Sequence, residues 1–226
     1  TTHIQEINKP YLLASIDFRK AFDCVNWDFL TNVLRKSGFP DKIIQMYKVL
    51  HSNIFTRLVT HGGLTEPFQI KRGVPQGAPS SSLLYVVAAE LLSNRVRQHD
   101  TIKGLSLPGY HQEKKLVQFA DDTQMILELQ PGCLQAARTT IEEFAQTSGL
   151  TLNPSKSDAM PIGNHPADKP IPFFDDFKRD NNSIFILGTT LTCDDKPATV
   201  RNFMQKQHQI GEMMYRLGKS FNSTLG

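Results

Sequence analysis

An Asp-Asp pair set between two apolar runs constrains the fold of this chain more than any other feature of its sequence. Residues 116–127 read LVQFADDTQMIL, and Asp121 and Asp122 lie near the middle. Two short apolar runs separated by polar turn residues are typical of a β-hairpin. We therefore expect a tight hairpin with both acids at its tip.

A third acid ends another apolar run, far away in the sequence. Residues 11–18 read YLLASIDF, the pattern of a short buried strand that stops at Asp17. If this strand neighbours the hairpin, three carboxylates converge at one edge of a sheet. Three like charges repel one another unless cations lie between them, and hard divalent cations take carboxylate oxygens as ligands. Taken alone, an Asp-Asp pair is more often simply a pair of polar turn residues.

The remaining patterns predict an α+β domain in which helices back an antiparallel sheet. Amphipathic spacing, capping residues and Gly or Pro stops predict helices over residues 26–36, from 40 onward, and over 80–98, 132–148 and 197–221. Strands are expected at residues 54–60 and 64–70, as a hairpin around 61–63, and at 150–153 and 159–162, with an apolar segment at 184–191. Residues 163–183 are polar and contain prolines, which predicts an exposed insertion.

Composition excludes several other classes of protein. No apolar run approaches the roughly 20 residues needed to cross a bilayer, and the N-terminal residues do not have the pattern of a signal peptide. Cys24, Cys133 and Cys193 form neither a metal-type pair nor a disulfide framework. We therefore expect an intracellular protein of the nucleus or cytoplasm, not a secreted or membrane protein. The net charge of +3 is compatible with a nucleic-acid partner but is weak evidence for one.

Several segments, in the same order along the chain, resemble the motifs of one family. Residues 16–23 (IDFRKAFD), 72–80 (RGVPQGAPS), 119–122 (FADD) and 150–157 (LTLNPSKS) are similar to the palm motifs of reverse transcriptases of the non-LTR (LINE-type) retrotransposon group. Residues 186–189 (ILGT) resemble the primer-grip hairpin less closely, because Ile186 stands where the family often carries an aromatic residue. The resemblance implies a polymerase palm over residues 1–192 and the start of a helical thumb over 193–226.

The resemblance also implies how the acids act. Asp17, Asp121 and Asp122 would be catalytic and would hold metal ions, together with the backbone carbonyl of Phe18. The implied cofactor is Mg²⁺, with Mn²⁺ as a substitute. Lys156 is a candidate catalytic proton donor to the leaving pyrophosphate, because free lysine has a pKa of about 10.4 and is protonated at neutral pH. An ordinary exposed turn charge is an equally weighted alternative for this lysine.

Further residues would bind substrates. The resemblance implies a nucleotide site of Phe18, Lys20, Ala21, Phe22, Gln76 and Gly77, and primer or template contacts by Arg72, Pro79, Phe119, Ala120, Leu187 and Gly188. Phe22 falls at the steric-gate position, where its ring would clash with a ribose 2′-hydroxyl and so select deoxynucleotides. Without the resemblance, core packing would be the preferred interpretation of Phe22, and surface charge is at least as good an interpretation of Arg72.

The implied partners are an RNA template, a DNA or RNA primer and dNTPs. The family's fingers precede the first palm motif, whereas sixteen residues precede Asp17 here. We therefore expect a fragment without its fingers, most of its thumb and other element-encoded domains. Two alternatives stay open beside RNA-directed DNA synthesis: a noncatalytic palm-like module or inactive element relic, and RNA synthesis on the same palm, against which Phe22 argues.

Overall fold

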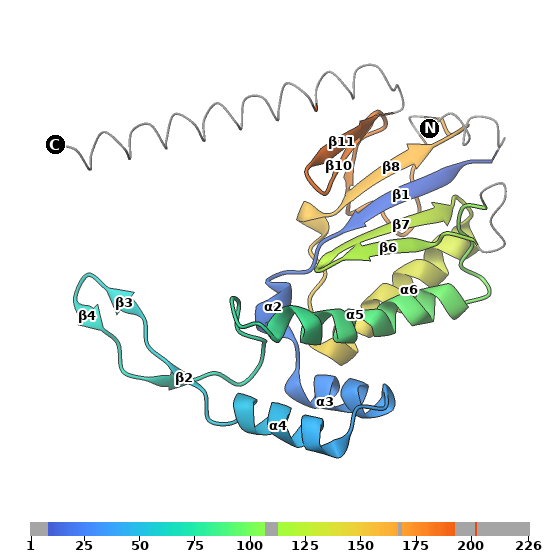
Figure 1. Ribbon diagram of the computed structural model, residues 1–226. Coiled ribbons are helices and arrows are strands. Elements are labelled where there is room, and N and C mark those ends of the chain that lie inside the picture. Colours follow the sequence, from blue (N-terminus) through green and yellow to red (C-terminus); the bar gives the residue numbers. More distant parts are fainter. Residues whose placement is uncertain (1–8, 107–112, 167–168, 193–201, 203–226) are drawn as a thin grey trace.

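A five-stranded sheet lies at the centre of the computed structural model, which describes residues 9–106, 113–166, 169–192 and 202. The strand order is β6-β7-β1-β8-β9, and Figure 1 shows β6, β7, β1 and β8 side by side in this order. These strands are β1 (Tyr11–Ile16), β6 (Leu116–Phe119), β7 (Asp122–Glu128), β8 (Asp158–Ile162) and β9 (Lys178–Arg179). Every neighbouring pair is antiparallel except β8 and β9.

Helices cover one face of the sheet, as the sequence predicts. They are α2 (Ala21–Cys24), α3 (Trp27–Lys36), α4 (Asp41–His51), α5 (Ser81–Gln98) and α6 (Pro131–Ser148). In Figure 1, α5 and α6 lie against the sheet, while α3 and α4 form a further layer below. Asn26 caps α3, because its Oδ1 accepts hydrogen bonds from the backbone N–H groups of Asp28 and Phe29 at 2.8 and 3.0 Å. The short helix α2 was not predicted.

Strand β1 is buried on both faces, and this holds its end in place. Leu12, Ala14 and Ile16 belong to the main core cluster, which they share with the inward faces of α5 and α6. Leu13 points to the opposite face, since side chains alternate along a strand. There it packs with Met160, Ile162 and Ile184, the last from the hairpin of β10 (Ser183–Ile186) and β11 (Thr189–Thr192).

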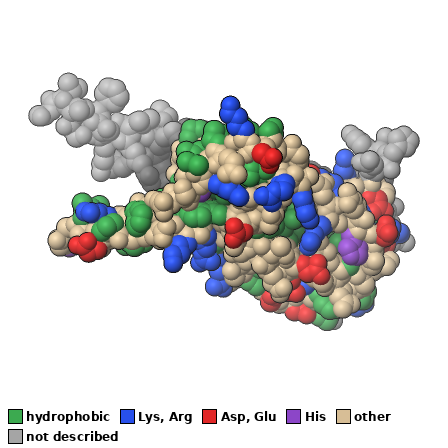
Figure 2. Space-filling model, turned by 90° about the horizontal axis from the view of Figure 1, so that it is seen from below, with side chains coloured by type: hydrophobic (Ala, Val, Ile, Leu, Met, Phe, Trp, Pro, Cys, Tyr) green, Lys and Arg blue, Asp and Glu red, His purple; other side chains and the backbone are tan. Residues whose placement is uncertain are grey.

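A narrow hairpin projects from the helical layer (Figure 1). Within it β2 (Phe55–Thr56) pairs with β5 (Phe68–Gln69), and β3 (Val59–Thr60) pairs with β4 (Gly63–Leu64). The predicted hairpin is confirmed, although its ladder is broken into two short parts. Figure 2 shows apolar side chains along this projection and Lys and Arg side chains over the neighbouring helical face. None of the described helices is long and apolar enough to cross a membrane.

The expected strand at residues 150–153 is wrong. Only Leu152 pairs, in a single antiparallel bridge with Phe18. Pro154 follows directly and cannot donate a backbone hydrogen bond, so the chain turns into the 3-10 helix η1 (Pro154–Lys156). The predicted strand at 159–162 is confirmed as β8. The expected thumb helix at 197–221 lies outside the described residues.

The expectation of an exposed insertion at residues 163–183 is also wrong. Ile171, Phe174 and Phe177 are buried and belong to the main core cluster. The surrounding prolines and charged residues made the segment read as polar. The three apolar residues are spaced three residues apart, so they can share one side of the segment. The segment then adds β9 to the edge of the sheet beside β8.

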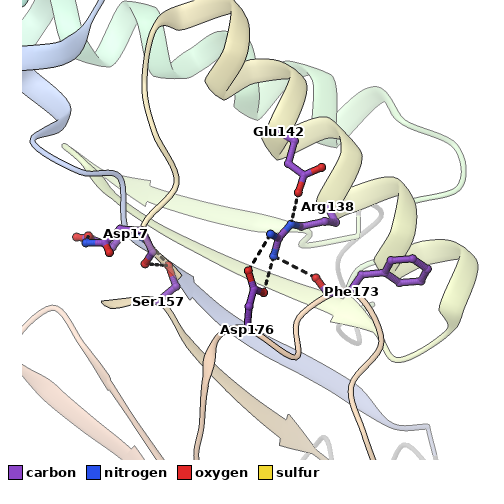
Figure 3. A network of polar contacts seen from close by, with 7 residues as sticks. Asp17, Arg138, Glu142, Ser157, Phe173 and Asp176 are labelled. Atoms are coloured by element: carbon purple, nitrogen blue, oxygen red, sulfur yellow. Dashed lines mark hydrogen bonds and ion pairs between the residues drawn. The ribbon is translucent and has the colours of Figure 1, made fainter. Parts of the chain in front are cut away.

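Arg138 on α6 fastens this segment to the helical layer. Its guanidinium donates hydrogen bonds to both carboxylate oxygens of Asp176 at 2.8 and 2.9 Å, to Glu142 at 2.6 Å and to the carbonyl of Phe173 at 3.1 Å (Figure 3). It also lies over the ring of Phe177, 5.6 Å from the centroid. A bidentate arginine–carboxylate pair adds geometric specificity as well as energy.

We expect the Asp176→Asn variant to lose less stability in acid than the wild type. The hydrogen bond from Arg138, above all, lowers the pKa of the Asp176 carboxyl. Such a group contributes stability above its unfolded pKa of about 3.9 and loses that contribution as the pH falls through its folded pKa. Below about pH 4, the free energy of unfolding measured in urea should therefore fall less steeply with decreasing pH in this variant than in the wild type. Asp175→Asn, at the exposed neighbouring position, should follow the wild type. An unchanged acid slope in Asp176→Asn would contradict this account.

Candidate active site

Strand register brings Asp17 beside Asp122. Strands β1 and β7 pair from Tyr11 opposite Glu128 to Ile16 opposite Thr123. Asp17 directly follows the last paired residue of β1, and Asp122 directly precedes the residue of β7 that pairs with it. Because paired residues of antiparallel strands have Cα atoms about 5 Å apart, the two acids adjoin at one edge of the sheet.

The third acid occupies the turn of the neighbouring hairpin. Phe119 pairs with Asp122, which leaves Ala120 and Asp121 as a two-residue connection. Ala120 has φ 53°, in the left-handed region that two-residue hairpin turns use at their first central position. A residue with a Cβ pays about 1–2 kcal/mol for that conformation, and such strain is often found at functional sites. The predicted position of both acids at the hairpin tip is confirmed.

The three carboxylates form one electrostatic cluster. Burial, followed by the negative charges of Asp121 and Asp17, raises the pKa of Asp122. Burial also raises the pKa of the Tyr85 phenol, and the charges of all three acids add to this effect. Negative charge is therefore concentrated where β1, β7 and the start of α5 come together.

An open pocket of about 580 Å³ lies in front of Asp17 and Asp121. Its wall includes six other residues that the sequence predicts to act in catalysis or nucleotide binding: Phe18, Lys20, Ala21, Phe22, Gln76 and Lys156. The ring of Phe18 is buried against Phe144, with centroids 6.0 Å apart, so only its backbone remains for a ligand. Gly77 follows Gln76, and a Cβ added there would meet nothing within 4 Å.

A second hollow, of about 460 Å³, lies beside Asp122. It is lined by Phe119, Leu187 and Gly188, three of the predicted primer or template residues. Leu187 and Gly188 have φ values of 49° and 75° and form the turn between β10 and β11, which carries them to the acid pair. The other three predicted contacts line neither hollow. Ala120 lies in the turn of the β6–β7 hairpin, and Arg72 and Pro79 are exposed in the loop before α5.

The Phe22 ring stacks on Tyr85. The two rings are 4.6 Å apart between centroids, with an interplanar angle of 20°. Phe22 is half-buried and contributes to the pocket wall, whereas Tyr85 is buried behind it. The gate position and core packing are thus compatible, because one face of the ring packs on Tyr85 while the side chain still lines the pocket.

Backbone contacts hold the loop of residues 71–79 against α2. The N–H groups of Gly73 and Val74 donate to the carbonyls of Val25 and Phe22 at 2.8 and 2.7 Å. The indole Nε1 of Trp27 donates to the carbonyl of Gly73 at 2.7 Å. This anchoring places Gln76 at the pocket wall.

We expect Gly73→Ala to destabilise the fold far more than Gly77→Ala. The two glycines have φ values of 89° and 88°, but an added Cβ would lie 2.5 Å from the Asp23 carbonyl oxygen at Gly73 and would meet nothing within 4 Å at Gly77. Both variants lose about 1–2 kcal/mol to backbone strain, and the clash should add about 1–3 kcal/mol at Gly73 alone. Urea unfolding of both variants measures the difference, and equal losses would show that the loop does not pack as described.

Sequence reasoning missed the residues that hold Asp17. The Nδ2 of Asn153 donates to Asp17 Oδ2 at 2.7 Å, and the backbone N–H of Asp17 donates to Ser157 Oγ at 3.0 Å. Figure 3 shows Ser157 beside Asp17 where β1 ends. The available signal was the LNPSKS segment at residues 152–157. Asn153 and Ser157 stand on either side of Lys156, which was the only residue of the segment predicted to be functional. Tyr85 was missed as well, because nothing in the sequence indicates which aromatic residue backs Phe22.

The donor chemistry of this cluster fits a divalent cation. In the described part of the chain, no group of three or more Asp, Glu, His or Cys side chains has the geometry of a formed metal site. Three carboxylates nevertheless adjoin with no basic side chain paired to them in any described ion pair. Burial is the main cause of the raised pKa of Asp122, and the negative charges of Asp121 and Asp17 add to it. A hard cation with oxygen ligands would relieve this negative charge.

An antiparallel sheet backed by helices, with acids at adjoining strand ends beside an open pocket, defines a polymerase palm. The chain belongs to the reverse transcriptase (RNA-dependent DNA polymerase) family, whose model matches residues 1–191.

Its relatives include proteins of non-LTR retrotransposons. The chain is 29% identical over 205 residues to the transposon TX1 uncharacterized 149 kDa protein of Xenopus laevis, covering 91% of this chain and 15% of that protein. It is 30% identical over 148 residues to a Pol polyprotein from the type-1 retrotransposable element R2 of Popillia japonica, covering 66% of this chain and 24% of that protein. The chain thus spans less than a quarter of the length of either relative.

Solved structures share the fold. The apo telomerase from Candida tropicalis superposes with a TM-score of 0.59 at 14% sequence identity, covering 85% of this chain and 33% of that one. A form of the same telomerase truncated from its C-terminal domain gives a TM-score of 0.58 at 17% identity, covering 85% of this chain and 36% of that one. At such low identities the likeness establishes the palm fold.

Proposed function

We propose that this chain is the catalytic palm of an RNA-directed DNA polymerase of the non-LTR retrotransposon type. It would join dNTPs to the 3′-hydroxyl of a DNA or RNA primer on an RNA template, inside the cell, in the nucleus or cytoplasm. The observation that carries the proposal is the register that sets Asp17 beside Asp122, with Asp121 in the adjoining turn. Family membership and the retrotransposon relatives support it. The proposed palm covers residues 1–192, and the proposed thumb begins at 193.

In this proposal the acids bind the cofactor. Asp17 and Asp121, at the pocket wall, are the principal ligands, Asp122 supports them from the second hollow, and the Phe18 carbonyl completes the set. Bound Mg²⁺, or Mn²⁺ in its place, neutralises the charge that develops on the attacking and leaving oxygens. The three carboxylates fix where that charge is neutralised, because the end of β1, the start of β7 and the turn before β7 hold them.

Lys156 would serve as the general acid. It is exposed at the wall of the same pocket, so its ammonium group can turn toward the leaving pyrophosphate. An ammonium group arrives protonated at neutral pH and can give its proton to the departing oxygen.

The nucleotide would occupy the larger pocket, and the primer end would occupy the second hollow. In the larger pocket, the backbone near Lys20 and Ala21 meets the triphosphate, while Phe22, Gln76 and Gly77 surround the sugar and base. Phe119, Leu187 and Gly188 would hold the primer end beside Asp122, with Ala120 between the two sites, and Arg72 and Pro79 would approach the template. Contacts should be mostly to the nucleic-acid backbone, since a polymerase must accept any sequence.

Primer extension on an RNA template tests the proposal. A labelled primer annealed to RNA is supplied with dNTPs and Mg²⁺, using this chain and any longer protein that carries it. We expect template-directed extension that EDTA abolishes and excess Mg²⁺ restores. Binding of primer–template without any extension would instead favour the noncatalytic module. A preference for rNTPs over dNTPs would favour RNA synthesis.

A further inference from the structure

We propose that Asn153 is a positioning residue that orients the Asp17 carboxylate toward its metal ion, with Ser155 fixing the direction of the Asn153 amide. This inference rests on the proposed function, since it assumes that Asp17 is a metal ligand. It assigns a role to a buried side chain that is neither a predicted ligand nor a predicted substrate contact.

The turn at residues 153–157 holds Asp17 by several groups at once. The Asn153 Nδ2 donates to Asp17 Oδ2 at 2.7 Å, and the Asn153 backbone N–H donates to the Asp17 carbonyl at 2.9 Å. The Asp17 backbone N–H donates to Ser157 Oγ at 3.0 Å, and this hydroxyl donates in turn to the Asn153 carbonyl at 3.0 Å. The backbone and one carboxylate oxygen of Asp17 are therefore both fixed by a segment distant in sequence.

The direction of the amide is itself determined. The Asn153 Oδ1 accepts a hydrogen bond from Ser155 Oγ at 3.0 Å, so the NH₂ group is left to face Asp17. Asn153 is buried, with a relative exposure of 7%, and its hydrogen bond to the half-buried Asp17 is electrostatically stronger there than it would be in water. Oδ2 is engaged by Asn153, and no hydrogen bond within the described residues engages Asp17 Oδ1, which is therefore the oxygen available to a cation.

The chemistry of an amide suits this position. A lysine or arginine at residue 153 would neutralise Asp17 and compete with the metal ion for it. A neutral N–H donor orients the carboxylate and leaves its charge in place, and outer partners of this kind typically alter metal affinity by about 10–100-fold. Asn153 also begins η1, since its carbonyl accepts from the Lys156 N–H at 3.0 Å, so one turn supports both the ligand and the candidate acid.

Direct Mn²⁺ binding to the 226-residue chain tests this role. Free Mn²⁺ is measured by electron paramagnetic resonance during titration of the wild type, Asp17→Asn, Asn153→Ala and Asn26→Ala, with folding checked by circular dichroism. Asn26 is the matched control, because its side chain also makes two hydrogen bonds, but as the cap of α3. We expect Asn153→Ala to weaken Mn²⁺ binding roughly 10-fold or more and Asn26→Ala to leave the affinity unchanged.

A second variant covers the case in which Asn153→Ala does not fold. Ser155→Ala alters an exposed residue and removes only the contact that fixes the amide, and it should weaken binding by roughly 3-fold, a smaller effect of the same kind. Wild-type affinity in Ser155→Ala, and in Asn153→Ala if it folds, together with lost binding in Asp17→Asn, would overturn the role of Asn153 alone. Wild-type affinity in Asp17→Asn would instead overturn the proposed function.

Discussion

Asp17→Asn and Asp121→Asn should each reduce the rate of primer extension by roughly 10³-fold or more. Each change keeps the size of the side chain but removes a negative charge that the proposed metal ions require. Both residues line the larger pocket, where the proposed function makes them the principal metal ligands. Asp122→Asn should have a smaller effect, because Asp122 faces the second hollow and acts as a supporting ligand.

The matched control for these variants is Asp23→Asn. Asp23 belongs to the same sequence motif and is exposed on α2, but it lines neither hollow. Its variant should extend primers at the wild-type rate. Initial rates are compared at saturating Mg²⁺ and dNTP, after circular dichroism has confirmed that each variant folds. Full activity in Asp17→Asn or Asp121→Asn would refute the proposed mechanism.

Phe22→Ala should lower the discrimination between dNTPs and rNTPs by roughly 10²-fold. The Phe22 ring forms part of the pocket wall and is held there by its stack on Tyr85. Removing the ring opens room for the 2′-hydroxyl, so incorporation of rNTPs should rise while kcat for dNTPs changes much less. The measured quantity is the ratio of kcat/KM for dATP to that for ATP.

Two further variants separate the gate from general packing. Phe22→Tyr keeps the ring and should keep the wild-type ratio. Tyr85→Leu should give an intermediate ratio, because the Phe22 ring can then retreat into the space behind it. A ratio that stays at the wild-type value in Phe22→Ala would show that Phe22 does not select dNTPs and serves only in core packing.

The sequence was sufficient to predict the elements that carry the acids. Alternating and continuous apolar runs ended at Asp17 and at the Asp121–Asp122 pair, and both ends are strand ends in the structure. What it could not supply was the pairing of these strands. A shift of one residue would turn every side chain of β1 to the other face, and nothing local to residues 11–18 chooses between the two registers.

Other features depended on contacts between distant segments. Residues 163–183 read as an exposed insertion because Ile171, Phe174 and Phe177 are scattered among prolines and charges, and only the surfaces they meet show that they are buried. Asn153 read as part of a strand, yet its amide meets Asp17 across 136 residues of sequence. The resemblance pointed to Lys156 in this segment, while the geometry draws attention to its neighbours.

A crystal structure of the chain with Mn²⁺, read by anomalous scattering, tests the central claim most directly. The account predicts anomalous peaks between Asp17 and Asp121, with carboxylate oxygens at about 2.0–2.2 Å, close to the distances expected for small divalent cations. Such peaks should disappear in Asp17→Asn. Strong peaks elsewhere on the molecule with none between these two side chains, or an Asp17 carboxylate turned away from the tip of the β6–β7 hairpin, would contradict it.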